Sequence, residues 1–209
     1  MNNNSTIETT RVFLVRHGVT AQTGTVMYGH TKGLDLNDEG REQAKLISDY
    51  LSMVHVDAIF SSPLERAYQT AEAIAKDRGL EISVRDELID THIGAWTNFT
   101  LKECAEFPEW KTVQEHPSQF RFPDGETFAE LLERIDIVVR DIVSSHIGKN
   151  IVITCHRDPI LILLSSYMGL HMDLFQRISC VPASVSEVRF TDGIARVESV
   201  NVVPTQRMV

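Results

Sequence analysis

Short apolar runs alternate along the chain with segments in which apolar residues recur at helical spacing. The apolar runs predict strands at residues 11–15, 56–60, 82–85, 151–154, 185–190 and 194–202. The helical spacing predicts helices at residues 38–53, 63–78 and 127–145, and a further helix that starts at Asp158-Pro159. Strands that alternate with helices form a largely parallel sheet covered on both faces. We therefore predict an α/β protein, a three-layer α/β/α fold with a mostly parallel central sheet.

The length of 209 residues fits one domain, residues 1–209, with a sizeable core. Residues 1–10 are polar and are expected to form a flexible N-terminal lead. Residues 95–125 show no regular period and are expected to form a cap-like insertion. At the expected helix starts, Asn37 and Ser62 are predicted N-caps, with Pro63 in the first helical position.

Composition and charge narrow the range of partners. Hydrophobic residues make up 43% and charged residues 23% of the chain, and the net charge is −9. An acidic chain argues against general binding to nucleic acid or a membrane surface. Its longest apolar run is far shorter than the ~20 residues of a membrane helix. An anionic substrate therefore needs a local cationic pocket.

The three cysteines, Cys104, Cys155 and Cys180, are odd in number and widely spaced. They suggest neither a disulfide framework nor a zinc site, so no metal is expected. A reducing cytoplasm is the simplest location. The oligomeric state stays open, with a homodimer as one alternative.

Cationic residues gather where the predicted strands end. Arg16 and His17 follow the first strand, Arg66 lies one turn into the helix after the second, and His156 and Arg157 follow the fourth. The carboxyl ends of strands in open α/β sheets carry the ligand sites. Two like charges ~4 Å apart repel by roughly 4 kcal/mol at an effective dielectric constant of about 20. A phosphate dianion reverses that sign, and the arginine fork matches its oxygens.

Five segments in chain order strengthen this interpretation: residues 14–20 with Arg16-His17-Gly18, then 36–44, 61–71, 123–127 and 151–156. Together they resemble the histidine phosphatase superfamily, which includes cofactor-dependent phosphoglycerate mutases and many small phosphatases. A lone Arg-His-Gly tripeptide is a weak motif, but five motifs at family-like spacing are specific. The resemblance runs from about Arg11 to Phe190 and implies a phosphoglycerate-mutase-like fold.

The resemblance implies roles for the residues at the strand ends. His17 attacks phosphorus and becomes a phosphohistidine, which is covalent catalysis that needs no cofactor. Arg16, Arg66 and His156 bind the phosphoryl oxygens and stabilise the transition state. His17 must present an unprotonated nitrogen, so its other nitrogen needs an acceptor, and we expect a backbone carbonyl of the Gly18 turn.

The family takes its general acid from a Leu-x-Glu-x-x-x-Gly pattern, which residues 88–94 resemble. Asp90 occupies the glutamate position and is the expected acid, although its side chain is one methylene shorter. Asp86, Glu87 and His92 compete for this role. The alternative is that Asp90 only caps N–H groups of its own loop.

The sequence also departs from the family pattern. Arg157 stands where glycine is common, so it is either strained at positive φ or adds a further cation to the pocket. Thr23 falls where mutases carry a phosphate-binding asparagine, and a hydroxyl can serve there too. Tyr28, Gly29 and His30 match the substrate loop and, with Arg157, are expected to contact the substrate.

We expect a phosphomonoester hydrolase that acts through a phosphohistidine on a small phosphorylated metabolite. Thr91 replaces the arginine of the mutase pattern, and residues 96–123 hold six aromatic residues but only three cations. The main alternative is a cofactor-dependent phosphoglycerate mutase. A metal-dependent hydrolase, for which no HxH or HExxH spacing is present, and a non-catalytic phospho-ligand binding protein are less favoured.

Overall fold

The computed structural model describes residues 8–205, and its centre is a six-stranded sheet in the order β3-β2-β4-β1-β5-β6. The strands are β1 (Thr9–Arg16), β2 (Ala58–Ser61), β3 (Ile82–Val84), β4 (Asn150–Cys155), β5 (Val185–Thr191) and β6 (Ile194–Val202). The first four pair in parallel, and β5 and β6 add an antiparallel edge. The predicted mostly parallel sheet is confirmed.

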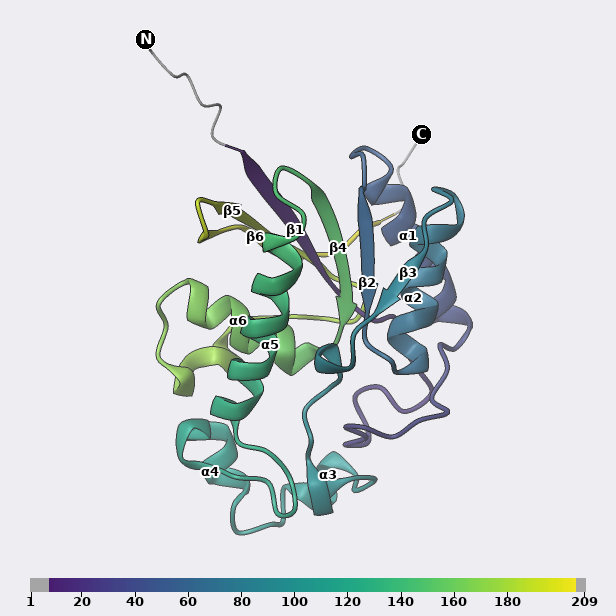
Figure 1. Ribbon diagram of the computed structural model, residues 1–209. Helices are drawn as coiled ribbons and strands as arrows, with labels where there is room; N and C mark the ends of the chain where they lie inside the picture. The colour runs from purple at the N-terminus through teal and green to yellow at the C-terminus, as the bar shows by residue number, and fades with distance from the viewer. Residues whose placement is uncertain (1–7, 206–209) are drawn as a thin grey trace.

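Side chains of β1 alternate between two apolar layers, as expected for a strand buried on both faces. Val12 and Leu14 join the core on the side of α5 (Phe128–Ser144) and α6 (Arg157–Tyr167). Phe13 and Val15 join the core on the side of α1 (Asp38–Leu51) and α2 (Glu65–Lys76). Figure 1 shows the two helix pairs on opposite sides of the sheet, which confirms the three-layer fold.

The helix starts agree with the sequence in part. Asn37 caps α1, and Thr127 opens α5 with a capping box to Glu130. The prediction for α2 is wrong by two residues, because the helix begins at Glu65 and Leu64 is its N-cap. Ser62 cannot act as a simple cap, since its hydroxyl also bonds His156 across the sheet.

The predicted flexible lead needs correction where it can be examined. Residues 1–7 lie outside the described part of the chain. Thr9 and Thr10, however, already belong to β1 and pair with Thr191 and Phe190 of β5. Pairing with β5 thus extends β1 toward the N-terminus, beyond the apolar residues that predicted the strand.

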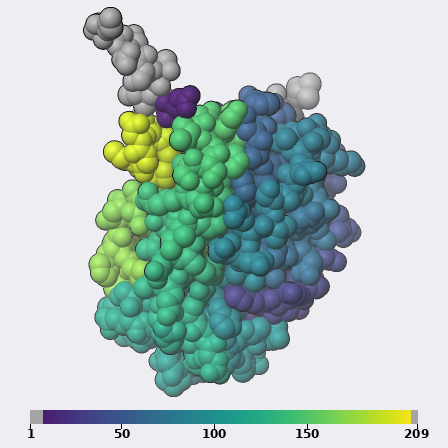
Figure 2. Space-filling model, viewed as in Figure 1, coloured from purple at the N-terminus to yellow at the C-terminus, as the bar shows by residue number. Residues whose placement is uncertain are grey.

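Between β3 and α5 the chain forms only short helices, as the sequence predicted. These are η1 (Asp86–Leu88), η2 (Gly94–Trp96), α3 (Leu101–Cys104), α4 (Trp110–Glu115) and η3 (Pro117–Gln119), and η4 (Met172–Arg177) follows α6. Trp96 is their hub and contacts the rings of Phe107, Trp110, Phe120 and Phe122. α3 and α4 lie beyond the carboxyl ends of the parallel strands, and Figure 2 shows these teal residues at that end of the surface.

Candidate active site

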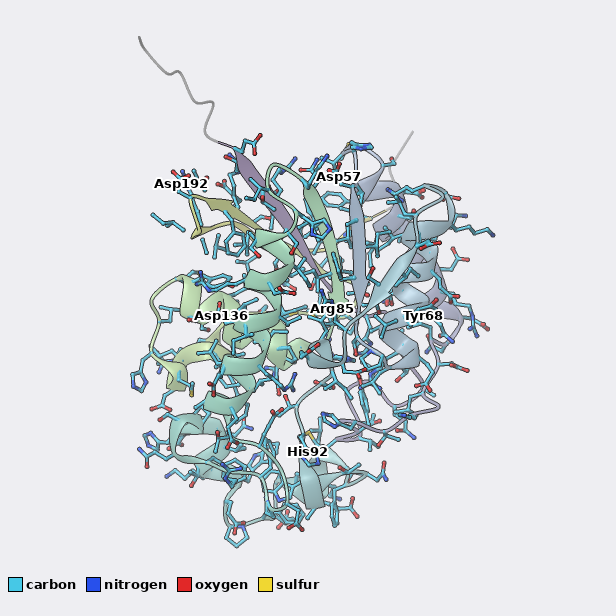
Figure 3. All side chains as sticks on the ribbon, in the orientation of Figure 1. Asp57, Tyr68, Arg85, His92, Asp136 and Asp192 are labelled. Atoms are coloured by element: carbon cyan, nitrogen blue, oxygen red, sulfur yellow. The ribbon has the colours of Figure 1, made fainter. Side chains whose placement is uncertain are left out.

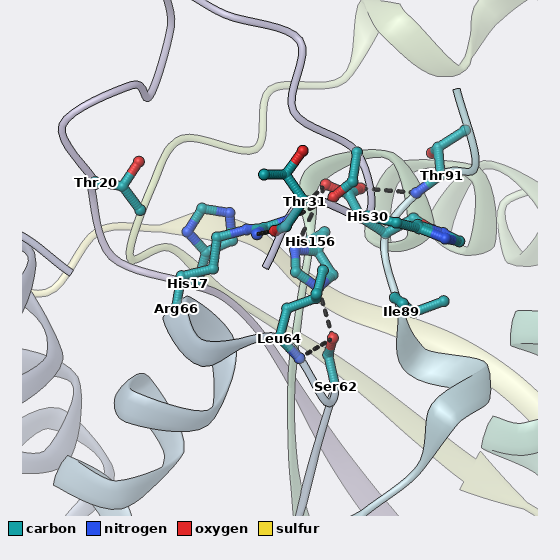
Figure 4. A network of polar contacts seen from close by, with 12 residues as sticks. His17, Thr20, His30, Thr31, Ser62, Leu64, Arg66, Ile89, Thr91 and His156 are labelled. Atoms are coloured by element: carbon teal, nitrogen blue, oxygen red, sulfur yellow. Dashed lines mark hydrogen bonds and ion pairs between the residues drawn. The ribbon is translucent and has the colours of Figure 1, made fainter. Parts of the chain in front are cut away.

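Four predicted residues meet at the carboxyl ends of the central strands. Arg16 ends β1 and His17 follows it, Arg66 lies in the first turn of α2, and His156 follows β4. His17 is 1% exposed, and Arg66 and His156 are fully buried. The two imidazole rings are 5.3 Å apart between centroids. Figure 4 shows His17, Arg66 and His156 side by side, so the chain brings together residues that are far apart in sequence.

The His17 ring is fixed by its own backbone. Its Nδ1 lies 2.7 Å from the Gly18 carbonyl oxygen, so Nδ1–H donates and Nε2 keeps a free lone pair. This is the acceptor that the sequence predicted. Any residue could supply this carbonyl, but a glycine is needed at position 18 because a Cβ there would lie 2.6 Å from the Gly40 carbonyl oxygen.

Both histidines are held in the neutral form. Burial, followed by repulsion from His156, Arg66 and Arg16, lowers the pKa of His17 well below its ordinary value. Burial, followed by Arg66 and Arg16, lowers the pKa of His156 in the same direction. Desolvation and neighbouring cations both disfavour an imidazolium. The lowered pKa favours the neutral imidazole of His17 at neutral pH, with the Nε2 lone pair available.

The tautomer of His156 follows from its partner. Its Nε2 lies 2.7 Å from the Ser62 hydroxyl, which itself accepts from the Leu64 N–H at 3.3 Å. Among the described residues, the buried Ser62 O–H contacts no acceptor other than Nε2, so the hydroxyl donates to Nε2 and Nδ1 carries the ring proton. Within residues 8–205, Nδ1 has no hydrogen-bond partner, and neither do the buried Nε atoms of Arg16 and Arg66. A phosphoryl group supplies the oxygen acceptors that such donors require.

Asp90 reaches the same site despite its short side chain. Its Oδ2 lies 3.3 Å from Arg66 Nη2 and 3.6 Å from His156 Nδ1, and its Oδ1 accepts from the Thr91 N–H. Asp90 lines the cavity, whereas the competing residues Asp86, Glu87 and His92 do not. The position of its loop therefore places the shorter aspartate side chain within reach of the arginine.

The loop that carries Asp90 is held by residues that the sequence did not single out. Arg134 of α5 donates to the carbonyl oxygens of Glu87, Ile89 and Asp90 and pairs with Glu126. Nothing in the spacing of these residues signals the contact, since they come from separate elements.

The predicted substrate loop divides into residues inside and outside the cavity. Tyr28 and Gly29 line it, and they also position Arg66, whose guanidinium lies over the Tyr28 ring and donates to the Gly29 carbonyl oxygen at 2.8 Å. His30 does not line the cavity; its Nε2 bonds the Asp90 carbonyl oxygen at 2.7 Å, and its ring stacks on His92. In Figure 3, His92 lies at the cap end of the sheet and Asp57 at the opposite end.

Two other predictions have different outcomes. Thr23 does not line the cavity, because its hydroxyl accepts from the Thr20 N–H at 2.9 Å and also contacts the Thr20 hydroxyl. The structure therefore gives Thr23 a local turn-stabilising contact in place of a phosphate contact. Arg157 starts α6 without a positive φ, so it is not strained. It lines the cavity and pairs with Asp158 at 2.5 Å.

The cavity has a volume of about 450 Å³ and two unlike ends. The acidic and basic lining residues are Arg16, His17, Asp90, Arg157 and Asp158. The rest of the lining is mostly apolar and comprises Gly24, Val26, Met27, Tyr28, Gly29, Ile93, Trp96, Leu101, Trp110, Val113, Phe122 and Phe128 together with Thr91, Gln114 and Gln176. Within residues 8–205, no three His, Cys, Asp or Glu side chains are grouped as metal ligands, and no helix is long and apolar enough to cross a membrane.

Comparison with known proteins settles the family. The model of the histidine phosphatase superfamily (branch 1) matches residues 12–203. This chain belongs to that superfamily. It is 29% identical to phosphoserine phosphatase 1 of Hydrogenobacter thermophilus, over 87% of each chain. It is 32% identical, over 92% of its length, to a bifunctional protein of Mycobacterium tuberculosis, of which it spans 54%.

Solved structures give the same fold. A mycobacterial glucosyl-3-phosphoglycerate phosphatase superposes with a TM-score of 0.84 at 24% identity, covering 93% of this chain and 99% of the other. These comparisons confirm the predicted superfamily and fold, and they confirm that the protein is an enzyme.

Proposed function

We propose that this enzyme hydrolyses phosphomonoesters of small metabolites through a phosphohistidine on His17. The observation that carries the proposal is the state of His17, which is neutral, buried and fixed through Nδ1 with its Nε2 free. A free imidazole nitrogen beside two arginines is suited to attack a phosphoryl group that those arginines hold.

The reaction proceeds in two displacements. Nε2 of His17 forms a bond to phosphorus while the bond from phosphorus to the ester oxygen breaks, and Asp90 protonates the leaving oxygen. Water then attacks the phosphohistidine, Asp90 takes its proton, and phosphate leaves. Arg16, Arg66 and His156 donate to the phosphoryl oxygens in both steps, where the charge of the transition state is shared.

The residues of this site fit a hydrolase reaction better than a mutase reaction. The phosphoserine phosphatase relative is a hydrolase by name. A mutase must also hold a second acidic group of its substrate, and Arg157, the remaining arginine of the cavity lining, is paired with Asp158. We further propose that residues 95–125 act as a cap over the site. The three free, buried cysteines are compatible with a reducing compartment such as the cytoplasm.

The test is hydrolysis of p-nitrophenyl phosphate in the presence of EDTA by the wild type, His17→Ala and a control, His55→Ala. His55 is exposed and pairs with Asp57 at the opposite end of the sheet. The proposal predicts that wild type and His55→Ala release phosphate and that His17→Ala does not. Activity of His17→Ala equal to wild type refutes it, and loss of wild-type activity on chelation points to a metal-dependent reaction.

A further inference from the structure

We propose that the natural substrate carries an uncharged, largely apolar leaving group, an alkyl or aryl body without a second anionic group. This inference rests on the proposed function, since it concerns what is attached to the phosphate at His17. Its basis is the unequal distribution of acidic and basic residues along the cavity. Each such lining residue lies at the end of β1, just after β1 or β4, or in the Asp90 loop.

The apolar end of the cavity is a wall of closely packed aromatic side chains. Trp96, Phe122 and Phe128 are almost fully buried yet still line the cavity. Trp96 is backed by Phe107 and lies nearly parallel to Trp110 at 6.2 Å, and Phe122 packs edge-on against Phe128. Rings supported from behind keep their places, so the wall offers a ligand apolar surface that is already ordered.

Among residues 8–205, no basic side chain lines the apolar end of the cavity, so a second anion on the substrate has no free cation to pair with there. Arg157 is paired with Asp158. None of the three basic residues in the cap, Lys102, Lys111 and Arg121, lines the cavity, and Lys111 and Arg121 are also paired with Glu115 and Glu130. Moving an unpaired carboxylate from water to an apolar wall is unfavourable. The cavity therefore selects against substrates such as 3-phosphoglycerate.

A series of primary alkyl phosphates from ethyl to octyl tests this directly. Their leaving groups have similar acidity, so the chemical step is nearly constant and only the apolar contact grows. We expect kcat/KM to rise by up to about fourfold for each methylene that becomes buried. We also expect hexyl phosphate to exceed phosphoserine and 3-phosphoglycerate by at least tenfold. A flat series, with either charged substrate preferred, overturns the inference.

Two variants locate the effect. Trp110→Ala should flatten the alkyl series, and Phe99→Ala, an exposed aromatic outside the lining, should leave the slope and the activity on ethyl phosphate unchanged. Gln114→Arg places a cation in the apolar part at an exposed position and should shift preference toward 3-phosphoglycerate. An unchanged preference in this variant also counts against the inference. If no substrate is hydrolysed at all, the proposed function fails instead.

A different observation supports a second proposal: we infer that Arg134 is the positioning residue of the general acid. Its Nη1 donates to the carbonyl oxygens of Glu87 and Ile89 at 2.8 and 2.9 Å, and its Nη2 to that of Asp90 at 2.7 Å. Glu126 holds the guanidinium from the other side at 2.7 and 3.0 Å and accepts from the His92 N–H. One planar group thus fixes successive turns of the Asp90 loop.

The position of this loop matters because the Asp90 side chain is short and cannot compensate for a displacement of its backbone. A misplacement of about 1 Å at a reacting group can lower the rate on the order of 10²-fold. A lysine cannot replace the contact, since its three donors do not form the planar fork that serves three carbonyls and a carboxylate at once.

Leaving-group dependence separates positioning from a general structural role. An alkyl phosphate needs a proton on its leaving oxygen, whereas 2,4-dinitrophenyl phosphate does not. Arg134→Met should lower kcat/KM for butyl phosphate on the order of 10²-fold, toward the loss expected for Asp90→Asn, and leave kcat/KM for the dinitrophenyl ester within about threefold, because kcat/KM reports the first displacement alone. For Arg134→Lys, the activity on butyl phosphate should lie between those of the wild type and Arg134→Met. Arg140→Met, which removes the Asp136 pair on the same helix, is the matched control. Equal loss on both esters, or no loss, refutes the proposal.

Discussion

Removing the Ser62 hydroxyl tests the tautomer argument most sharply. Ser62 Oγ is the hydrogen-bond partner of His156 Nε2, and it directs the Nδ1 proton toward the site. In Ser62→Ala, Nε2 either stays buried without a partner or takes the proton itself. The second outcome turns an acceptor lone pair on Nδ1 toward the phosphoryl oxygens and toward Asp90 Oδ2, which lies 3.6 Å away.

The size of the effect follows from the bond that is lost. A hydrogen bond to a charged acceptor contributes about 1.5–3 kcal/mol, which corresponds to roughly a 10- to 150-fold fall in kcat/KM. We expect this fall with p-nitrophenyl phosphate, because the contact is to the phosphoryl group and not to the leaving group. The measurement is steady-state kinetics at pH 7 together with a thermal melt of each variant.

The matched control is Ser61→Ala. Ser61 is equally buried and adjacent, but its hydroxyl donates to the Ser62 carbonyl oxygen at 2.9 Å and does not touch a histidine. We expect it to lose about 1 kcal/mol of stability and to keep kcat/KM within about threefold. If Ser62→Ala and Ser61→Ala have the same kcat/KM, the Ser62 contact does not set the state of His156.

Three further predictions concern pH and stability. The pKa values of His17 and His156 are lowered in the folded protein, so the unfolded chain binds more protons below pH ~6.5. The free energy of unfolding should therefore fall as the pH is lowered, by up to about 1.4 kcal/mol per pH unit for each histidine. Thermal melts that are independent of pH between 7.5 and 5.5 would contradict this. Gly40→Ala places a Cβ 2.1 Å from the Val19 carbonyl oxygen and should lower Tm by several degrees, whereas an unchanged Tm would show that the turn can yield. Thr127→Ala removes the capping box of α5 and should cost about 1 kcal/mol in a denaturant titration, with activity retained.

The sheet and its layers were predictable because they depend on local patterns. The alternation of Val12 and Leu14 with Phe13 and Val15 along β1 specifies a strand buried on both faces. The convergence of Arg16, His17 and His156 follows from topology, since β1 and β4 are neighbouring parallel strands. The Gly18 acceptor follows from the need of a nucleophilic imidazole for a fixed tautomer.

Features that depend on distant partners were not predictable. Ser62 looks like a helix cap in sequence, but His156, 94 residues away, uses its hydroxyl, and α2 begins later. The hydroxyl of Thr23 is taken by Thr20, which no motif signals. The contact of Arg134 with the Asp90 loop joins separate elements and becomes visible only once the chain is folded.

The most direct measurement of the central claim is to trap the intermediate. The enzyme is mixed with p-nitrophenyl phosphate, denatured in alkali within milliseconds and digested, and the phosphorylated peptide is sequenced by mass spectrometry. The account predicts an alkali-stable phosphoryl group on His17 that is absent from His17→Ala and accumulates further when the second displacement is slowed. Turnover without any phosphoryl group on His17, or with it on another residue, would contradict the account.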